Sequence, residues 1–281
     1  MGDVSGLEVV KKMQQAWATR LGIDLDADGY CTSLDCNLFH PLSEECRAEF
    51  AAGDGSELGK GGARGKIQAL HSSAALACNF VEYWREGDLA VLGTAFGLST
   101  RPSCVAFERK LPTGLGGIAP NMDVVLYEPE GTVFAIECKF TEPYGRSRLR
   151  CYLKPKYFLD GRCLWTEVGL PGCQAFAEDL PNRARDFQLL DVSQLLKHML
   201  GLGRTGSRWR LCCLWYRVDG SVGDRHQEEL ERFSKELGAD AARFTSLTYQ
   251  ILFGRIRALI GPEHGAWVSY MGERYFQETA D

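Results

Sequence analysis

Apolar residues are concentrated in two runs on either side of a short turn near the middle of the chain. The runs cover residues 121–128 and 132–140 and are rich in β-branched and aromatic residues. Such runs around a Pro-Glu-Gly sequence predict a β-hairpin. Pro129 suits the first corner of a type I turn, and Gly131 suits the left-handed position that closes a three-residue loop.

The turn at residues 129–131 also predicts the register of the hairpin. Glu128 then lies opposite Thr132, and the pairing brings Asp123 opposite Glu137. Side chains alternate between the two faces of a strand. One face carries Asp123, Val125, Tyr127, Val133, Ala135, Glu137 and Lys139. The other face is apolar throughout and is expected to be core; it carries Met122, Val124, Leu126, Phe134, Ile136, Cys138 and Phe140.

Two carboxylates and an amine therefore gather at the open end of the first face. Opposed carboxylates repel one another, and more strongly beside apolar neighbours, unless a cation lies between them. Carboxylate oxygens suit Mg²⁺, which keeps positions open for water and phosphate. Asp123 and Glu137, with Lys139 beside them, could hold a metal and a water against a phosphodiester. The alternative is an ordinary Glu–Lys pair at a strand end, and a one-residue change in the turn would move Asp123 to the other face.

Periodic patterns predict further elements on both sides of the hairpin. Helical spacing of apolar residues marks residues 7–21, 67–85 and 183–200. Alternation predicts a strand at residues 103–109, and a near-continuous apolar run predicts a buried central strand at residues 208–218. Residues 226–281 are expected to form a helix, a short strand at 243–247, a helix at 248–259 and a terminal helix.

Polar residues inside these elements are candidates for the site or for the surface. Glu108 either adds a third acid to the site or lies exposed on its strand. Gln194 and His198 lie one turn apart at the edge of the apolar face of their helix. The polar positions of the second helix are expected to face solvent; they are Ser72, Asn79 and Glu82.

A basic segment follows the hairpin. Residues 141–182 show no clear periodicity, and no acid occurs between Glu142 and Asp160. The cations there are Arg146, Arg148, Arg150, Lys154 and Lys156, interleaved with Tyr144, Tyr152 and Tyr157. Cations interleaved with aromatic rings favour contact with a phosphate backbone and stacking on bases. The alternative is a solvated loop.

Cysteines and glycines cluster before the hairpin. Eleven cysteines and no secretory signal indicate reduced thiols and a cytoplasmic protein. Cys31, Cys36, His40 and Cys46 have the residue types of a zinc site, but their spacing matches no common ligand pattern, so packed thiols are the alternative. Residues 53–65 are glycine-rich and indicate a flexible linker, because they lack the spacing and the preceding strand of a phosphate loop.

Composition limits the kind of protein and of partner. The 281 residues are 45% hydrophobic and 25% charged, as expected for a globular chain of one large or two small domains. A net charge of -5 excludes a global basic field, so nucleic-acid contact requires a local patch. No apolar run approaches the length of a membrane span.

The predicted order over residues 67–218 is a helix, three strands, a helix and a strand, with Asp123 and Glu137-x-Lys139 on the hairpin. This order and motif resemble the PD-(D/E)XK nuclease superfamily. The resemblance implies an α/β fold with a restriction-endonuclease-like αβββαβ core, in which helices flank a mixed central sheet and further helices are added at both ends. It also implies metal binding by Asp123, Glu137 and the backbone carbonyl of Cys138, with Lys139 as the motif lysine and Gln194 facing the site.

Shorter stretches resemble a bacterial group of stand-alone proteins in that superfamily. They are His71-Ser-Ser-Ala-Ala-Leu-Ala-Cys-Asn79, Phe107-Glu108, Glu137-Cys-Lys-Phe-Thr-Glu142, Gln194-Leu-Leu-Lys-His198 and Thr248-Tyr-Gln250. One position departs from the motif, since Met122 stands where proline precedes the aspartate.

The leading hypothesis is a nuclease that acts on DNA with Mg²⁺, or with Mn²⁺, as its cofactor. Residues 1–65 would be a lead-in and residues 66–281 the nuclease-like domain, with a basic insertion at 141–182. One alternative is a nucleic-acid-binding or scaffold protein with a vestigial site, and another is a zinc-stabilised interaction domain. The sequence leaves open DNA against RNA, endonuclease against exonuclease cleavage, and whether the chain forms a homodimer.

Overall fold

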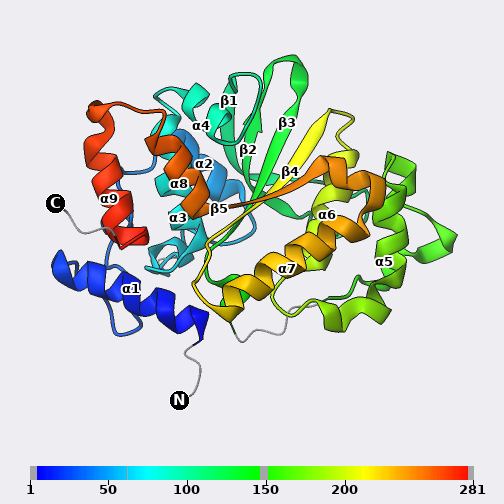
Figure 1. The fold of residues 1–281 in the computed structure, drawn as a ribbon, viewed down its shortest axis with the longest axis horizontal. Helices are drawn as coiled ribbons and strands as arrows, with labels where there is room; N and C mark the ends of the chain where they lie inside the picture. The colour runs from blue at the N-terminus through cyan, green and yellow to red at the C-terminus, as the bar shows by residue number, and fades with distance from the viewer. Residues whose placement is uncertain (1–4, 62, 146–150, 278–281) are drawn as a thin grey trace.

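A five-stranded mixed sheet forms the centre of the protein (Figure 1). The computed structural model describes residues 5–61, 63–145 and 151–277. The strands lie in chain order and are β1 (Cys104–Lys110), β2 (Asn121–Tyr127), β3 (Val133–Lys139), β4 (Trp209–Trp215) and β5 (Phe244–Thr248). The first three are antiparallel, whereas β4 pairs parallel with both β3 and β5. The predicted α/β fold with a mixed central sheet is therefore confirmed.

The hairpin of β2 and β3 has the predicted register. Val124 pairs with Ile136, and the N–H of Glu128 donates to the carbonyl of Thr132 at 2.8 Å. Gly131 is left-handed, with φ of 76°, as the turn chemistry requires. Glu130 is left-handed too, with φ of 65°, so the turn contains one more left-handed residue than the sequence predicts. This register brings Asp123 and Glu137 to the same end of the strand pair.

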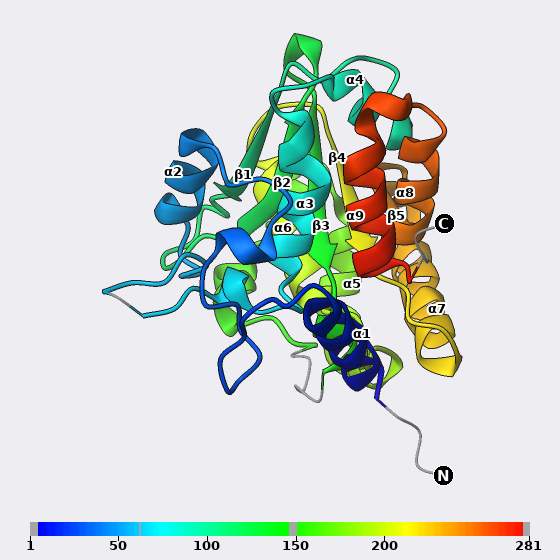
Figure 2. The ribbon, with the colours of Figure 1, turned by 90° about the vertical axis from the view of Figure 1, so that its left-hand side faces the viewer.

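Two layers of helices cover the sheet (Figures 1 and 2). The helices of one layer are α1 (Gly6–Arg20), α2 (Glu44–Ala52), α3 (Ser73–Val81), α4 (Leu89–Ala95), α8 (Tyr249–Arg257) and α9 (Gly265–Tyr275). Those of the other are α5 (Pro171–Arg183), α6 (Val192–Gly203) and α7 (Ser221–Glu236). Both faces of the sheet are therefore buried, which explains the near-continuous apolar run of β4.

Several helix boundaries differ from the periodic pattern. The helix predicted at 67–85 begins as α3 at Ser73, where the Ser72 hydroxyl accepts the N–H of Ala75 at 3.2 Å. The helix predicted at 183–200 begins as α6 at Val192, capped by Asp191. Helices α2 and α4 were not predicted, and α5 begins inside the segment expected to lack periodicity.

The glycine-rich segment is a tight turn in its described part, so the prediction of a flexible linker is wrong. A Cβ atom on Gly65 would lie 2.3 Å from the backbone oxygen of Glu57, and the N–H of Ile67 donates to the same oxygen at 3.1 Å. Only glycine permits this close approach of the two chain segments. The turn holds Glu57 half-buried at the sheet end that carries Asp123 and Glu137.

Two predictions about side-chain orientation are also wrong. Met122 packs with Val125, on the face opposite to Val124. The cause is on β1, where the left-handed residue Glu108 interrupts the strand pairing beside Asp123. Asn79 is buried and does not face solvent, since its amide nitrogen donates to the carbonyl of Asn37 and to the hydroxyl of Tyr275. Asn79 thus joins the loop before α2 to the C-terminal helix.

The eleven cysteines are free thiols, and eight of them are buried. Cys31 and Cys46 are buried in different apolar clusters, and Cys36 is exposed. Across the described residues, no three His, Cys, Asp or Glu side chains are arranged to hold a metal ion, so the proposed zinc site has no support. Within the same residues, no helix combines the length and hydrophobicity needed to cross a bilayer.

Candidate active site

The predicted acids and amine lie together where β2 begins and β3 ends. Asp123 is near the start of β2, and Glu137 and Lys139 project from the last residues of β3. The first turns of α6 pass over this sheet end and bring Gln194 and His198 into contact with the β3 residues. The site therefore combines a hairpin with one helix that is distant in sequence.

Asp123 is a half-buried acid with an incomplete set of partners. Its Oδ2 accepts the backbone N–H of Cys138 at 2.6 Å. Burial and the nearby charge of Glu137 nevertheless raise the pKa of Asp123 well above its usual range. The pKa is raised because two acids share one desolvated site, as the register predicts.

Glu137 is the more readily ionised acid of the pair. Its side chain is 1% exposed, and its Oε1 lies 2.6 Å from Lys139 Nζ. Although burial opposes ionisation, Lys139 and His198 lower the pKa of Glu137 to about 2. Nε2 of His198 lies 2.9 Å from Oε2 of Glu137, but without the alignment of a hydrogen bond. Glu137 Oε2 is thus a buried oxygen that has no hydrogen-bond donor in the described part of the chain.

Lys139 connects the strand to the helix. Its Nζ donates to Glu137 Oε1 at 2.6 Å and to Gln194 Oε1 at 2.9 Å. Burial lowers the pKa of Lys139, but Glu137, Glu142 and Asp123 outweigh burial and raise it well above the ordinary value. An ammonium has three donors, so one N–H remains for a substrate or water. The side chain is 16% exposed, which leaves a route from solvent.

Glu108 belongs to this end of the sheet rather than to an exposed strand face. It is half-buried, and its Oε2 accepts the side-chain amide of Asn121 at 2.9 Å. Burial raises its pKa, and the charges of Glu57 and Glu137 add to that effect. Its φ is 51°, a left-handed conformation that glutamate rarely adopts. The kink turns the Glu108 side chain toward the other acids.

Further charged residues at the site were not selected from the sequence. Glu57 comes from the glycine-rich turn, and its pKa is raised by burial and by Glu142. Lys197 is half-buried on α6, three residues after Gln194, and its pKa is lowered by burial first and then by Lys154 and Lys139. The i, i+3, i+4 spacing of Gln194, Lys197 and His198 was a readable signal, because it puts all three on one helix face. Glu57 had no such signal.

The basic insertion is described only in part. Arg146, Arg148 and Arg150 lie outside the described residues. Lys154 is exposed, and Lys156 Nζ donates to the carbonyl of Gly116 at 2.5 Å. The stacking expected of the tyrosines is not available to Tyr144 and Tyr157, which are buried, whereas Tyr152 is 52% exposed. Of the three rings, Tyr152 alone could meet a base.

The donor atoms at the site suit a hard divalent cation. Asp123 and Glu137 provide carboxylate oxygens, and one of them, Glu137 Oε2, is buried without a hydrogen-bond donor. The repulsion that raises the pKa values of crowded acids is relieved when a cation binds between them. The thiol of Cys138 is buried in the core, as expected, so only its backbone could take part.

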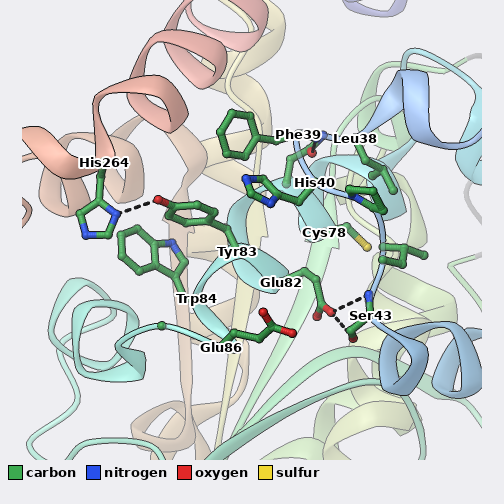
Figure 3. Close-up of a pocket in the computed structure, with 14 residues that line it drawn as sticks. Leu38, Phe39, His40, Ser43, Cys78, Glu82, Tyr83, Trp84, Glu86 and His264 are labelled. Atoms are coloured by element: carbon green, nitrogen blue, oxygen red, sulfur yellow. Dashed lines mark hydrogen bonds between the residues drawn. The ribbon is translucent and has the colours of Figure 1, made fainter.

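A separate cavity lies near the C-terminal end of α3, away from these acids (Figure 3). It has a volume of about 340 Å³, and its lining includes His40, Glu82, Tyr83 and His264. The Tyr83 hydroxyl and His264 Nδ1 are 2.8 Å apart. None of the residues predicted for the nuclease site lines this cavity.

Comparison with known proteins gives one family and no individual relative. Neither the curated proteins nor the solved structures include a match. A model of the family described as "Restriction Endonuclease associating with ARP" matches residues 11–276, which is nearly the whole chain and contains every described site residue. The protein therefore belongs to the REase-ARP family of restriction endonucleases.

Proposed function

We propose that this protein is a Mg²⁺-dependent DNA nuclease of the PD-(D/E)XK type, with Mn²⁺ as a second suitable ion. Membership in a restriction endonuclease family implies a DNA nuclease. The metal and the residue roles are our proposal. One observation carries it: the half-buried Asp123 and the buried Glu137 share one sheet end with Lys139, and desolvation and Glu137 raise the pKa of Asp123.

Asp123 and Glu137 would hold the metal through their carboxylate oxygens, with the Cys138 carbonyl as a third oxygen donor. When bound, such a metal stabilises charge on phosphate oxygens and makes water a better nucleophile. The pKa of Glu137 is lowered to about 2, whereas burial and Glu137 raise the pKa of Asp123, so Asp123 is the harder of the two ligands to ionise. Metal binding should therefore weaken as pH falls.

Lys139 would act as a charged hydrogen-bond donor. The neighbouring carboxylates raise its pKa, so the amine keeps its proton and is a poor base in this state. Two of its three donors point to Glu137 and Gln194, and the third can bind a phosphate oxygen or orient a water. Gln194 fixes the direction of that third donor by holding the ammonium from the α6 side.

Cations on the basic insertion and on α6 would bind the DNA backbone. Lys154 is exposed, and the half-buried Lys197 has no ion pair among the described residues. An unpaired ammonium beside the site is suited to a phosphate next to the scissile one. Lys156 and the arginines 146, 148 and 150 belong to the same proposal by sequence position.

Cleavage assays with matched variants test the function. Linear, circular and single-stranded DNA should be incubated with and without Mg²⁺, beside Asp123→Asn protein. We expect cleavage by wild type only with the divalent ion, and none by the variant. Equal cleavage by both proteins would refute the assignment. A thermal shift on adding Mg²⁺, present in wild type and absent in the variant, separates a nuclease from a DNA-binding protein with a vestigial site.

A further inference from the structure

Three arginines surround a surface cavity between α7 and the segment that leads into α6. The cavity has a volume of about 250 Å³. Arg185 comes from the single turn after α5, and Arg225 and Arg232 come from α7. Arg225 and Arg232 are seven residues apart, two helical turns, so both point to the same side of α7.

The arginines of α7 do not make the ion pairs that their spacing favours. Glu228 and Glu229 lie three and four residues after Arg225, and Glu228 lies four residues before Arg232, which are spacings at which opposite charges usually pair. Within the described chain, Arg185 and Arg225 have no ion pair or hydrogen bond. Arg232 donates only to the backbone oxygen of Asp186, at 3.0 Å.

The acids that could neutralise the cavity are turned to other partners. The Glu229 carboxylate is buried and accepts the backbone N–H groups of residues 188, 189 and 190, at 2.8–2.9 Å. Asp186 Oδ2 lies 2.7 Å from Arg183 Nε. Of the lining acids, only Glu228 keeps an unengaged carboxylate, and it is exposed. The cavity therefore presents free guanidinium donors in excess of free acid.

The cavity lies close to the proposed active site. Gln188 lines it, and Gln194, which holds Lys139, follows six residues later. Six residues span at most about 20 Å even when extended. Nucleotides of one strand advance by about 3.4 Å along a duplex, so the distance between the cavity and the active site corresponds to about six nucleotides at most.

We propose that Arg185, Arg225 and Arg232 form a second phosphate-binding site, which holds the DNA backbone a few nucleotides from the cleavage position. Guanidinium groups bind phosphate oxygens through paired N–H donors, and three of them on one concave surface can enclose a single phosphate. The inference rests on the proposed nuclease function, since it assigns this phosphate to the same substrate. The site would position DNA without touching the reacting atoms.

DNA binding without cleavage tests this site. Affinity for a labelled duplex should be measured in EDTA over a salt series, for wild type and for Arg185→Gln/Arg225→Gln/Arg232→Gln protein. Loss of one phosphate contact should reduce affinity about tenfold and lower the slope of log affinity against log salt by about one. The corresponding triple lysine variant should keep the slope but bind more weakly, because it keeps the charge and loses the paired donors. Arg101→Gln, at the opposite end of the sheet, is a control for the loss of a single surface charge and should leave both values unchanged.

Each remaining outcome decides against the site or for it. If wild type cleaves DNA while the triple glutamine variant keeps its affinity and salt slope, the phosphate site is wrong and the nuclease assignment stands. If wild type neither binds nor cleaves DNA, both fail. Inorganic phosphate that competes with DNA for wild type but not for the variant would support the proposal. If wild type binds phosphate but the variant keeps the DNA affinity of wild type, the cavity is a site for free anions and the proposal is overturned.

Discussion

The carboxylate of Asp123 accepts the backbone N–H of Cys138 at 2.6 Å, across the strand pair that also carries Glu137. This hydrogen bond fixes the acid at the sheet end and lowers its pKa, but burial and the charge of Glu137 outweigh it. The free protein therefore contains a local repulsion that is relieved either by a proton on Asp123 or by a bound cation.

Replacing Asp123 with asparagine should stabilise the metal-free protein and abolish its response to metal. Asparagine keeps an acceptor for the Cys138 N–H but cannot ionise. A raised pKa favours the protonated fold, so wild type loses stability as pH rises through that pKa, and the variant does not. At neutral pH its melting temperature should rise by about 3 °C for each kcal/mol of repulsion removed. Differential scanning calorimetry with and without Mg²⁺ measures both effects.

Two companion variants define what the asparagine result means. Asp123→Ala also loses the acceptor for Cys138 and should be less stable than Asp123→Asn by about 1 kcal/mol. Glu130→Gln removes an acid from the exposed hairpin turn and should respond to Mg²⁺ like wild type. A Mg²⁺-induced shift that persists in Asp123→Asn would exclude this carboxylate as a ligand.

The hairpin was predictable because turn chemistry and alternation are local. Pro129 and Gly131 set the loop, and the loop sets which residues face each other. The prediction of the face of Met122 failed for a local reason on the neighbouring strand. The left-handed backbone of Glu108 breaks the alternation at Met122. Periodicity cannot reveal such a kink, since glutamate has no preference for it.

Contacts made by tertiary packing were less accessible to the sequence. The helix after the hairpin was expected, and its Gln194 does contact Lys139, but the contact of His198 with Glu137 was not predicted. Glu57 reaches the site because Gly65 allows two backbone segments to meet, and glycine-rich composition alone indicated a linker. Apolar periodicity also placed the starts of α3 and α6 too early, because the capping residues Ser72 and Asp191 decide where those helices begin.

Removing the Lys139 charge should destabilise the protein through Glu137. In Lys139→Met, the buried carboxylate of Glu137 loses its ammonium partner. The substitution should therefore lower the free energy of unfolding by about 3 kcal/mol. Adding Glu137→Gln should recover most of that loss, since no buried charge is left unpaired. Urea denaturation of both single variants and of the double variant gives the coupling energy. Cleavage should be absent in all three variants. If the double variant is as unstable as Lys139→Met, the ion-pair account is contradicted.

The acid dependence of stability should report the contact between His198 and Glu137. A carboxyl whose folded pKa is about 2 contributes stability that is present above its unfolded value of 4.5 and is lost as pH falls toward 2. His198→Leu should raise this pKa, so the cost of the substitution near neutral pH should shrink as pH falls from 4.5 to about 2. Urea denaturation over that pH range measures the change. In a Glu137→Gln background, this part of the cost should no longer depend on pH.

Glu108 allows the backbone cost of the site to be separated from its charge. Its φ of 51° should cost about 1 kcal/mol relative to glycine, so Glu108→Gly should stabilise the protein by about that amount, and by more once the repulsion from Glu57 and Glu137 is lost. Glu108→Gln keeps the strained backbone and should gain only the stability that comes from removing the charge repulsion.

If Glu108 contributes to the site, both variants should weaken Mg²⁺ binding, measured by calorimetric titration. Glu130→Gly relieves a similar left-handed φ of 65° in the hairpin turn and should gain stability with unchanged Mg²⁺ affinity. Unchanged affinity in the two Glu108 variants would make the kink a structural feature only.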